Sequence, residues 1–349
     1  MSDLEEKKKK DEVVSHLKRV TYPGLSRDIV SFGFVKSVNL NGNNVNIDIE
    51  VSTKEDHVLE DIEQNVRKAL SSIGWIGEIY LSVRKKGSPF HKKKPPIKGK
   101  FVAIYSTKGG VGKSAVAVNL SFALKNLGLK TSLLDLDVYG PSIPLMTGTQ
   151  GYKPHSPDGI RIIPNEKNGI KIMSLGYLVE SDTPVIWRGP MVAKAFDTLV
   201  FDTLWPETEI LIADMPPGTG DVQLSLAQKA LIDGIVIVTT PQEASLLDVR
   251  RGIKMFEKLD VKIVGIVENM SYFICPNCGV KHYIFGEGGG SRVSKDYKIP
   301  FLGELPIDPR IREFGDIGKS IIEIDPQCNT SLAFFDLAKK IAQEFSLIQ

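Results

Sequence analysis

The spacing of hydrophobic residues changes near residue 100 and divides the chain into two predicted regions. In the first region, hydrophobic residues at positions 13, 14, 17 and 20 follow helical spacing, and a second helix is predicted over residues 59–70. Alternating patterns predict strands over 29–40, 45–51 and 79–83, the first two joined by a turn at 41–44. We therefore expect a small α+β domain over residues 13–83.

Beyond residue 100, short apolar runs alternate with helical patterns. Strands are expected over 101–104, 131–134, 170–175, 210–213, 234–239 and 262–267, with a helix over 115–127. This alternation predicts an α/β domain over residues 100–349, with a mostly parallel sheet covered by helices on both faces. Ligands on such sheets bind at the carboxyl ends of the strands.

Composition and charge narrow the class of protein. The chain has 349 residues, a net charge of +2 and 42% hydrophobic residues. No apolar run reaches the ~18 residues of a membrane helix. Residues 1–12 form a charged tail rather than a secretory signal, so we expect a cytoplasmic protein without a membrane partner. Residues 84–99 are basic and contain proline, as linkers do, and they lack the interleaved aromatic residues of a nucleic-acid site.

The segment FVAIYSTKGGVGKS, residues 101–114, joins a predicted strand to a glycine-rich turn and the start of a helix. Glycines allow backbone N–H groups to converge on a phosphate, and the helix N-terminus adds its positive dipole end. Lys113 is expected to reach the β- and γ-phosphates, and the Ser114 hydroxyl to ligate Mg²⁺. The predicted nucleotide-binding residues here are Thr107, Lys108, Gly109, Gly110, Val111, Gly112, Lys113, Ser114 and Ala115.

Carboxylates follow two other predicted strands. Asp214 ends the apolar run ILIAD and is expected to hold Mg²⁺, with residues 215–221 as a switch loop near the γ-phosphate. Asp135 and Asp137 stand at a second strand end, where a carboxylate can orient the attacking water. Phosphoryl transfer depends mainly on such positioning and on charge neutralisation.

The pattern Lys-Gly-Gly-Val-Gly-Lys-Ser resembles the deviant Walker A loop of the MinD/ParA/nitrogenase iron protein class, with Thr107 at the first glycine position of the general loop. The resemblance implies that Lys108 contacts nucleotide across a dimer interface and acts with Lys113. It also implies that Asp137 orients water and that Asp135 and Asp214 lie nearer Mg²⁺. Asn269, after the strand predicted over 262–267, would read the adenine edge.

A second candidate site is the C-x-x-C of Cys275 and Cys278. Two thiolates at this spacing make half of a tetrahedral sulfur site, and the third cysteine, Cys328, stands alone. A symmetric dimer would supply four thiolates from two copies of the pair. From the residues alone, an iron–sulfur cluster and zinc are equally consistent, a monomeric zinc knuckle with His282 lacks a fourth ligand, and a redox pair is a weaker alternative.

Longer motifs distinguish between an iron–sulfur cluster, zinc and a redox pair at these cysteines. The segments LLDLDVYGPSIP, WRGP, DMPPGTGD, VTTPQ, VENMSYFICPNC, FGEGGG and LPIDPRIR closely resemble the Mrp/ApbC/NBP35 family of ATP-binding iron–sulfur cluster carriers. The resemblance implies a homodimer that hydrolyses ATP slowly, binds a labile [4Fe–4S] cluster between its subunits at Cys275 and Cys278, and delivers it to apo-proteins, with assembly factors as further partners.

The first region carries its own resemblance. The segment PGLSRDIVSFGFVKSV is similar to the MIP18-like (DUF59) module of iron–sulfur assembly proteins. Stand-alone members often carry a cysteine between the second strand and the second helix, but residues 52–57 here contain none. We therefore expect a docking or structural role at least as much as a cluster-ligating one. Two alternatives to a cluster carrier remain, a positioning ATPase of the MinD/ParA type and a zinc-bridged regulatory dimer.

Overall fold

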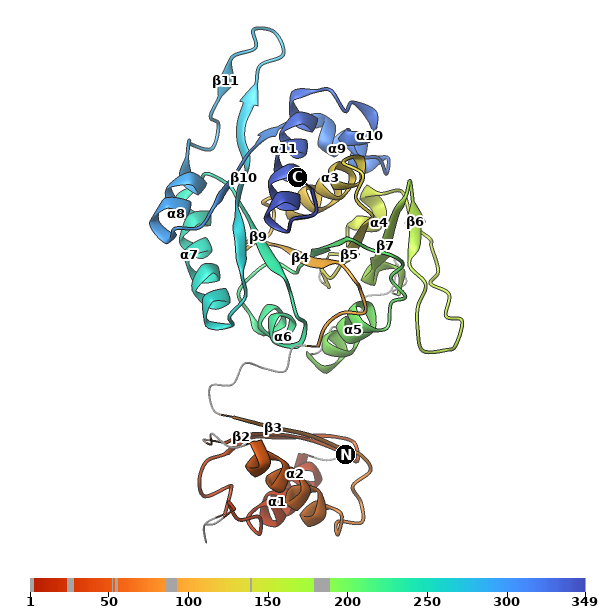
Figure 1. Cartoon of the computed structure of the whole chain (residues 1–349), viewed down its shortest axis with the longest axis vertical. Helices are drawn as coiled ribbons and strands as arrows, with labels where there is room; N and C mark the ends of the chain where they lie inside the picture. Colours follow the sequence, from red (N-terminus) through yellow and green to blue (C-terminus); the bar gives the residue numbers. More distant parts are fainter. Residues whose placement is uncertain are drawn as a thin grey trace. The chain divides into compact units, whose positions relative to one another are not determined.

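The computed structural model describes residues 3–348 except 24–27, 52, 54–55, 86–92, 139 and 179–188. It contains two compact units, Met1–Phe90 and His91–Gln349 (Figure 1). Each unit has its own cluster of buried hydrophobic side chains, and no residue belongs to both clusters.

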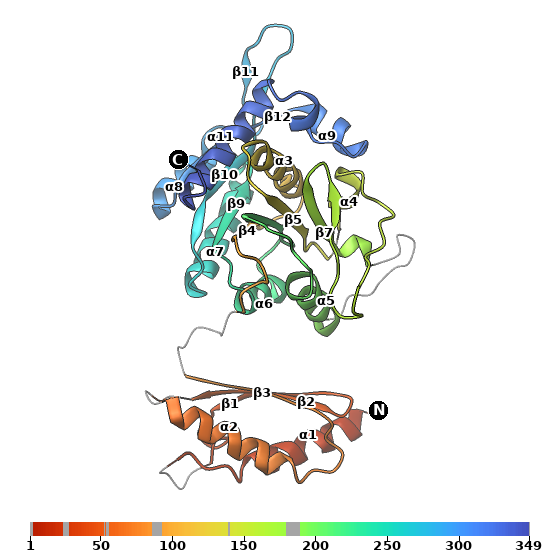
Figure 2. The same ribbon diagram turned by 45° about the vertical axis from the view of Figure 1, so that its right-hand side comes forward.

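The first unit is a three-stranded sheet with two helices. Its elements are α1 (Asp3–Leu17), β1 (Val35–Asn41), β2 (Asn44–Val51), α2 (Asp56–Leu70) and β3 (Ile79–Lys85). The strand order is β1-β2-β3, with β1 antiparallel and β3 parallel to β2. Both helices cover one face of the sheet (Figure 2). Alternate β2 residues are buried, which is the pattern of a sheet with one packed face.

Three boundaries differ from the sequence expectation. Helix α1 begins at Asp3, so residues 3–12 are helical because their Lys and Glu residues are good helix formers and Val13 and Leu17 anchor the helix in the core. Strand β1 begins at Val35, because the Asp28 carboxylate accepts the backbone N–H groups of Val30 and Ser31 and forms a turn.

The third boundary is the predicted linker. Strand β3 continues to Lys85. Lys93 exchanges backbone hydrogen bonds with Lys229 and Leu231 of the second unit, and Ile97 is buried there. Residues 93–99 therefore pack on the second unit rather than forming a free linker.

The second unit is a nine-stranded, mostly parallel sheet with helices on both faces, as the sequence predicts. Its order is β11-β10-β9-β4-β8-β5-β7-β6, and β12 also pairs with β10. Its strands are β4 (Lys100–Tyr105), β5 (Thr131–Asp135), β6 (Asn165–Lys167), β7 (Ile170–Ser174), β8 (Ile210–Asp214), β9 (Gly234–Thr239), β10 (Ile263–Ile274), β11 (Lys281–His282) and β12 (Phe301–Ile307). Its helices are α3 (Lys113–Asn126), α4 (Ile143–Met146), η1 (Leu175–Tyr177), α5 (Gly189–Phe201), α6 (Asp221–Lys229), α7 (Glu243–Lys258), α8 (Gly289–Tyr297), α9 (Pro309–Asp316), α10 (Ile321–Ile324) and α11 (Asn329–Glu344).

The six strands expected in this unit are present, and they form the middle of the sheet. Strands β6, β11 and β12 were not expected, because the first two have three and two residues and the third contains glycine and proline. Strand β10 has 12 residues and continues well past the expected end at residue 267. With β11 it forms a hairpin that extends beyond the neighbouring strands (Figure 1).

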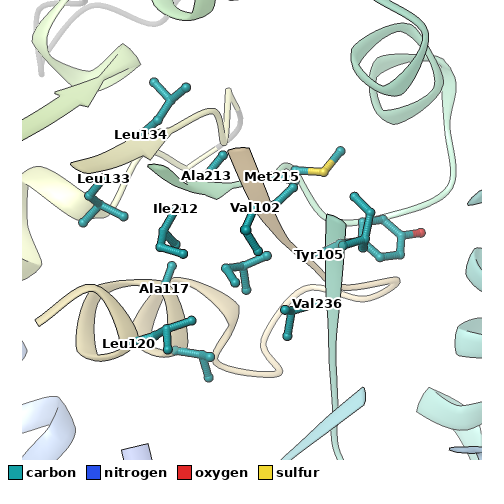
Figure 3. Packing of buried hydrophobic residues seen from close by; sticks show 14 of the residues in the cluster. Val102, Tyr105, Ala117, Leu120, Leu133, Leu134, Ile212, Ala213, Met215 and Val236 are labelled. Carbon is teal, nitrogen blue, oxygen red and sulfur yellow. The ribbon is translucent and has the colours of Figure 1, made fainter. Parts of the chain in front are cut away.

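The core lies between the sheet and its helices. Ala117 and Leu120 of α3 pack toward Val102 and Ile212 of the central strands (Figure 3). Helix α11 buries Phe334, Leu337 and Ile341 against the same core, which confirms that the C-terminal amphipathic segment is a packing helix. In the part of the chain that the structure describes, every helix is too short or too polar to cross a membrane.

Candidate functional site

The phosphate loop connects β4 to α3 at the carboxyl end of the sheet. Gly110 and Gly112 have φ angles of 79° and 81°, a left-handed conformation that favours glycine. A Cβ on Gly112 would lie 2.3 Å from Nδ2 of Asn269. Gly112 is therefore required both for its backbone conformation and for the close approach of Asn269.

Lys113 and Ser114 share one carboxylate. The Lys113 ammonium lies 2.5 Å from Oδ1 of Asp214, and the Ser114 hydroxyl donates to Oδ2 of Asp214 at 2.6 Å. Oδ2 of Asp137 lies 3.5 Å from the same ammonium. Burial alone lowers the pKa of Lys113, but Asp214 and Asp137 outweigh it and raise the pKa above its ordinary value. The structure thus brings together four of the predicted site residues.

Asp135 has a different environment from Asp137. It is fully buried, and burial, followed by the charge of Asp214, raises the pKa of Asp135 to about 7. Its oxygens accept hydrogen bonds from the Ser174 hydroxyl and from the backbone N–H groups of Asp137 and Ile143. Asp135 therefore holds the backbone that positions Asp137, while Asp137 faces Lys113.

Lys108 lies apart from this carboxylate cluster. Its ammonium is 3.4 Å from Oδ2 of Asp248 on helix α7, and its side chain is 40% exposed. Thr107 packs on the same helix, because a Cβ on Gly252 would lie 2.8 Å from the Thr107 methyl carbon. The Thr107 methyl group therefore lies close to Gly252, where a larger residue would collide with it.

The expected switch loop at residues 215–221 is tied to the phosphate loop. The Gly218 N–H donates to the Ser106 carbonyl at 2.9 Å, and the Tyr105 hydroxyl donates to the Gly218 carbonyl at 2.9 Å. Gln223 Nε2 donates to the Pro217 carbonyl at 2.6 Å. Tyr105 and Gln223 carry no sequence signal of this role, because each contact depends on how the strands are arranged.

Asn269 lies inside β10 and not after it, so its predicted position at a strand end was wrong. It is buried, and its Nδ2 donates to the Val111 carbonyl of the phosphate loop at 2.8 Å. Recognition of adenine by Asn269 stays a prediction.

The cysteine pair lies in the turn of the β10–β11 hairpin. The Cys275 N–H donates to the Val280 carbonyl at 3.0 Å, and the Gly279 N–H donates to the Cys275 carbonyl at 2.8 Å. Cys275 is half-buried and Cys278 is exposed. Hydrogen bonds from the backbone N–H groups of Cys278 and Asn277 lower the pKa of the Cys275 thiol, so the turn favours a thiolate.

The chain's other metal-ligating side chains do not join this pair. No three His, Cys, Asp or Glu side chains among the described residues are placed to hold a metal ion, so His282 does not complete a zinc knuckle within one chain. Cys328 lies at the start of α11, where its sulfur accepts the Ser331 N–H at 3.4 Å. One copy of the chain therefore offers only two thiols to a shared site.

The sequence of the chain matches two known protein families. Residues 98–342 match the family described as NUBPL iron-transfer P-loop NTPase, and residues 10–81 match the family described as iron-sulfur cluster assembly protein. The chain belongs to the NUBPL iron-transfer P-loop NTPase family. The resemblance to the Mrp group and to the MIP18-like module is confirmed.

Relatives of this family match nearly the whole chain. It is 38% identical over 342 residues to the iron-sulfur cluster carrier protein of Haemophilus influenzae, covering 96% of this chain and 91% of the relative. It is 39% identical over 346 residues to the iron-sulfur cluster carrier protein of Synechocystis sp., covering 97% of this chain and 98% of the relative.

Solved structures share the P-loop NTPase fold. A nucleotide-binding protein of Archaeoglobus fulgidus in complex with ADP matches with a TM-score of 0.59 and 38% identity, covering 68% of this chain and 92% of that one. The cell division ATPase MinD of Pyrococcus furiosus matches with a TM-score of 0.52 and 22% identity, covering 70% of this chain and 99% of that one. The second likeness concerns the fold alone.

Proposed function

We propose that this protein is an ATP-hydrolysing carrier of iron–sulfur clusters, in which two copies bind one labile [4Fe–4S] cluster through Cys275 and Cys278 and deliver it to apo-proteins. The observation that carries the proposal is the hairpin turn, which presents two thiols at the end of a strand that also contacts the phosphate loop. A cluster bound at an accessible turn can be passed on, whereas a cluster enclosed in a core cannot.

The number of thiols requires a dimer. A [4Fe–4S] cluster takes four thiolates, and one chain offers two at this turn. Two copies related by a two-fold axis complete the set with identical pairs. The lowered pKa of Cys275 supports ligation, because the thiolate is the form that binds metal. The relatives named as iron-sulfur cluster carrier proteins support the same cargo.

The nucleotide would lie along the phosphate loop, with its β- and γ-phosphates at Lys113. The donor set fits Mg²⁺, because the Ser114 hydroxyl and a carboxylate oxygen of Asp214 lie within 2.6 Å of each other and both are hard oxygen ligands. When bound, Mg²⁺ neutralises charge on the β- and γ-phosphates. The solved relative in complex with ADP supports nucleotide binding.

The residues proposed for hydrolysis would position the attacking water and neutralise charge, without forming a covalent bond to the substrate. Asp137, close to Lys113, would orient the attacking water, and Asp135 would hold the backbone of Asp137 in place. Lys108, paired with Asp248 in one copy, would reach the partner's nucleotide when two copies meet. ATP hydrolysis would be slow if Lys108 reaches the partner's nucleotide only after the dimer has formed. The protein would act in the cytoplasm, where thiols stay reduced.

Anaerobic reconstitution with iron and sulfide tests the carrier function. We expect the double variant Cys275→Ala and Cys278→Ala to lose the bound cluster while it still binds ATP. The matched control is Cys328→Ala, which removes the third cysteine and is expected to keep the cluster. Stoichiometric iron and sulfide on the double variant would refute the proposal.

The same samples distinguish the alternatives. Sedimentation of the reconstituted protein should show a dimer carrying one cluster for two chains. Metal analysis that finds zinc and no sulfide would favour a zinc-bridged dimer. ATP-dependent co-sedimentation with liposomes or DNA would favour a positioning ATPase.

A further inference from the structure

Strand β10 contacts the phosphate loop at one point and ends at the cysteine pair. Asn269 lies opposite the loop, and Cys275 follows the last residue of the strand. Five residues, 270–274, lie between the two positions. The six steps along the chain span roughly 20 Å at the rise of an extended strand. One continuous element therefore runs from the candidate nucleotide site to the candidate cluster site (Figure 1).

The contact with the loop is close and specific. Asn269 Nδ2 donates to the Val111 carbonyl at 2.8 Å, and the bond is buried. The Cβ position of Gly112 lies 2.3 Å from Asn269 Nδ2 and 3.4 Å from Met270 Cε. The peptide between Val111 and Gly112 belongs to the loop whose N–H groups would bind phosphate. A change in the orientation of this peptide would therefore act directly on Asn269 and Met270.

The strand is irregular where it meets the loop. Met270 has a φ angle of 55°, a left-handed conformation that is strained for a residue with a side chain. The pairing with β12 shifts register between Glu268 and Tyr272. We call residues 268–272 the β10 bulge. Such bulges redirect a strand, and a strained residue inside one can adopt a second backbone conformation.

The N-terminal side of the β10 bulge is firmly held. Glu268 is fully buried and accepts hydrogen bonds from the Ser271 hydroxyl at 2.6 Å and from the Gly290 N–H at 2.5 Å. Gly290 lies in the first turn of α8, so the carboxylate joins the strand to that helix. Beyond the bulge, Tyr272 and Phe273 pair with Pro306 and Ile307 of β12, and the hairpin turn follows Ile274. A rearrangement at Met270 would therefore reach the hairpin turn by shifting this short paired segment of β10.

We propose that the β10 bulge couples nucleotide binding at the phosphate loop to the presentation of Cys275 and Cys278, with Asn269 and Met270 as positioning residues. This inference rests on the proposed function and specifies how its two sites communicate. Phosphate binding reorients the Val111–Gly112 peptide, the Asn269 bond follows the Val111 carbonyl, and Met270 changes conformation. The hairpin beyond the bulge then moves and changes the exposure of the two thiols.

The test measures thiol reactivity in cluster-free protein, so it does not depend on a loaded cluster. Full-length protein is kept reduced with a phosphine, treated with an alkylating reagent with or without saturating ATP and Mg²⁺, and analysed by mass spectrometry. In the wild type we expect ATP to change the rates at Cys275 and Cys278 about fivefold or more, a common size for coupling between sites. Cys328 provides an internal control in the same molecule, and its rate should stay the same.

Two variants remove the coupling in different ways. Met270→Gly relieves the left-handed strain and removes the side chain over Gly112, and Asn269→Asp keeps the side-chain shape but removes the donor to Val111. In both, we expect the ATP-dependent change to disappear, with ATP binding measured separately by calorimetry. The matched control is Lys298→Gly, which changes an exposed residue with the same φ angle of 55° outside the β10 bulge and should keep the wild-type response.

The outcomes separate this inference from the proposed function. If wild-type protein with bound ATP shows no change at either thiol, or if both variants respond as the wild type does, the coupling is refuted while the carrier function stands. If both variants lose ATP binding altogether, these residues belong to the nucleotide site itself and the coupling is likewise refuted. Failure to bind a cluster refutes the carrier function whatever the alkylation rates show.

Discussion

The ammonium group of Lys113 and the carboxylate of Asp214 form a buried ion pair at 2.5 Å, although they are 101 residues apart in the sequence. Asp214 has no exposed side-chain surface, and that of Lys113 is 6% exposed. The same carboxylate accepts the hydroxyl hydrogen bond of Ser114. The pair thus combines the phosphate-binding cation and the proposed Mg²⁺ ligand in one contact, which makes Lys113 important for both stability and nucleotide binding.

Replacing Lys113 with methionine tests both roles. The variant Lys113→Met leaves Asp214 and Asp137 without their shared cation, so we expect the free energy of unfolding to fall by about 3 kcal/mol. ATP binding should also be lost, because Lys113 is the lysine expected to reach the β- and γ-phosphates. Urea unfolding and titration calorimetry measure the two effects.

Lys108→Met is the control for that variant. Because Lys108 is 40% exposed and its ion pair with Asp248 is long, its loss should cost less than about 1 kcal/mol. ATP binding should persist while turnover falls, since the proposed role of Lys108 is in the partner's site. Equal destabilisation by the two substitutions would contradict the ranking of these ion pairs.

Two glycines of the phosphate loop should respond differently to alanine. Gly112→Ala places a Cβ 2.3 Å from Asn269 Nδ2 on a backbone with φ of 81°, so we expect destabilisation of at least about 2 kcal/mol and loss of ATP affinity. Gly109→Ala meets no protein atom within 4 Å and has no left-handed φ, so it should unfold at the same temperature as the wild type in the absence of ATP. Thermal unfolding with and without ATP measures both, and an equally disruptive Gly109→Ala would show that the loop needs glycine for another reason.

Acid stability should depend on Asp308 at the start of α9. Burial alone raises the pKa of Asp308, but hydrogen bonds from Arg310 and Thr330 outweigh it and hold the pKa below its usual value. A depressed pKa stabilises the folded state above the unfolded-state pKa, and this contribution is lost as pH falls through the folded-state pKa.

Asp308→Asn removes the charge but keeps an oxygen able to cap α9. At pH 7, we expect the free energy of unfolding of this variant to be about 1 kcal/mol lower than that of the wild type. Near pH 3 the difference should be smaller, because the wild-type carboxylate begins to be protonated and loses its charge. Urea midpoints across this pH range provide the measurement. A constant difference between the two proteins at all pH values would assign the effect to packing instead of charge.

The two separate cores predict that the second unit folds alone. No buried residue is shared between the hydrophobic clusters of the two units. A fragment of residues 91–349 should therefore unfold cooperatively and bind ATP with the affinity of the full chain. Calorimetry on both proteins checks this expectation. A fragment that is unfolded at 25 °C would show that residues 1–90 contribute to the core of the second unit.

Much of the second unit was predictable, because its central strands are continuous apolar runs and its glycines mark the loop. Strand β12 was not predictable, because Gly303 and Pro306 are residues that sequence patterns count against a strand. The strand forms because it pairs with β10. The helical start of the chain was missed for a similar reason. The charged residues of α1 have no amphipathic pattern before Val13, and the helix is fixed by the buried residues that follow.

The phosphate loop and the cysteine pair can be recognised in the sequence, because each is built from residues that are close together in the chain. Left-handed glycines at 110 and 112, the adjacent Lys113 and Ser114, and two cysteines three positions apart each need only a short stretch of backbone. The residues that contact these groups in the folded protein could not be predicted from these short stretches of sequence. Asp214 contacts Ser114 across 100 residues and Asn269 contacts Val111 across 158. Both contacts depend on the order of strands in the sheet, in which β8 lies next to β4 and β10 lies two places from it. Strand order arises from packing of the whole domain, so no short segment contains it.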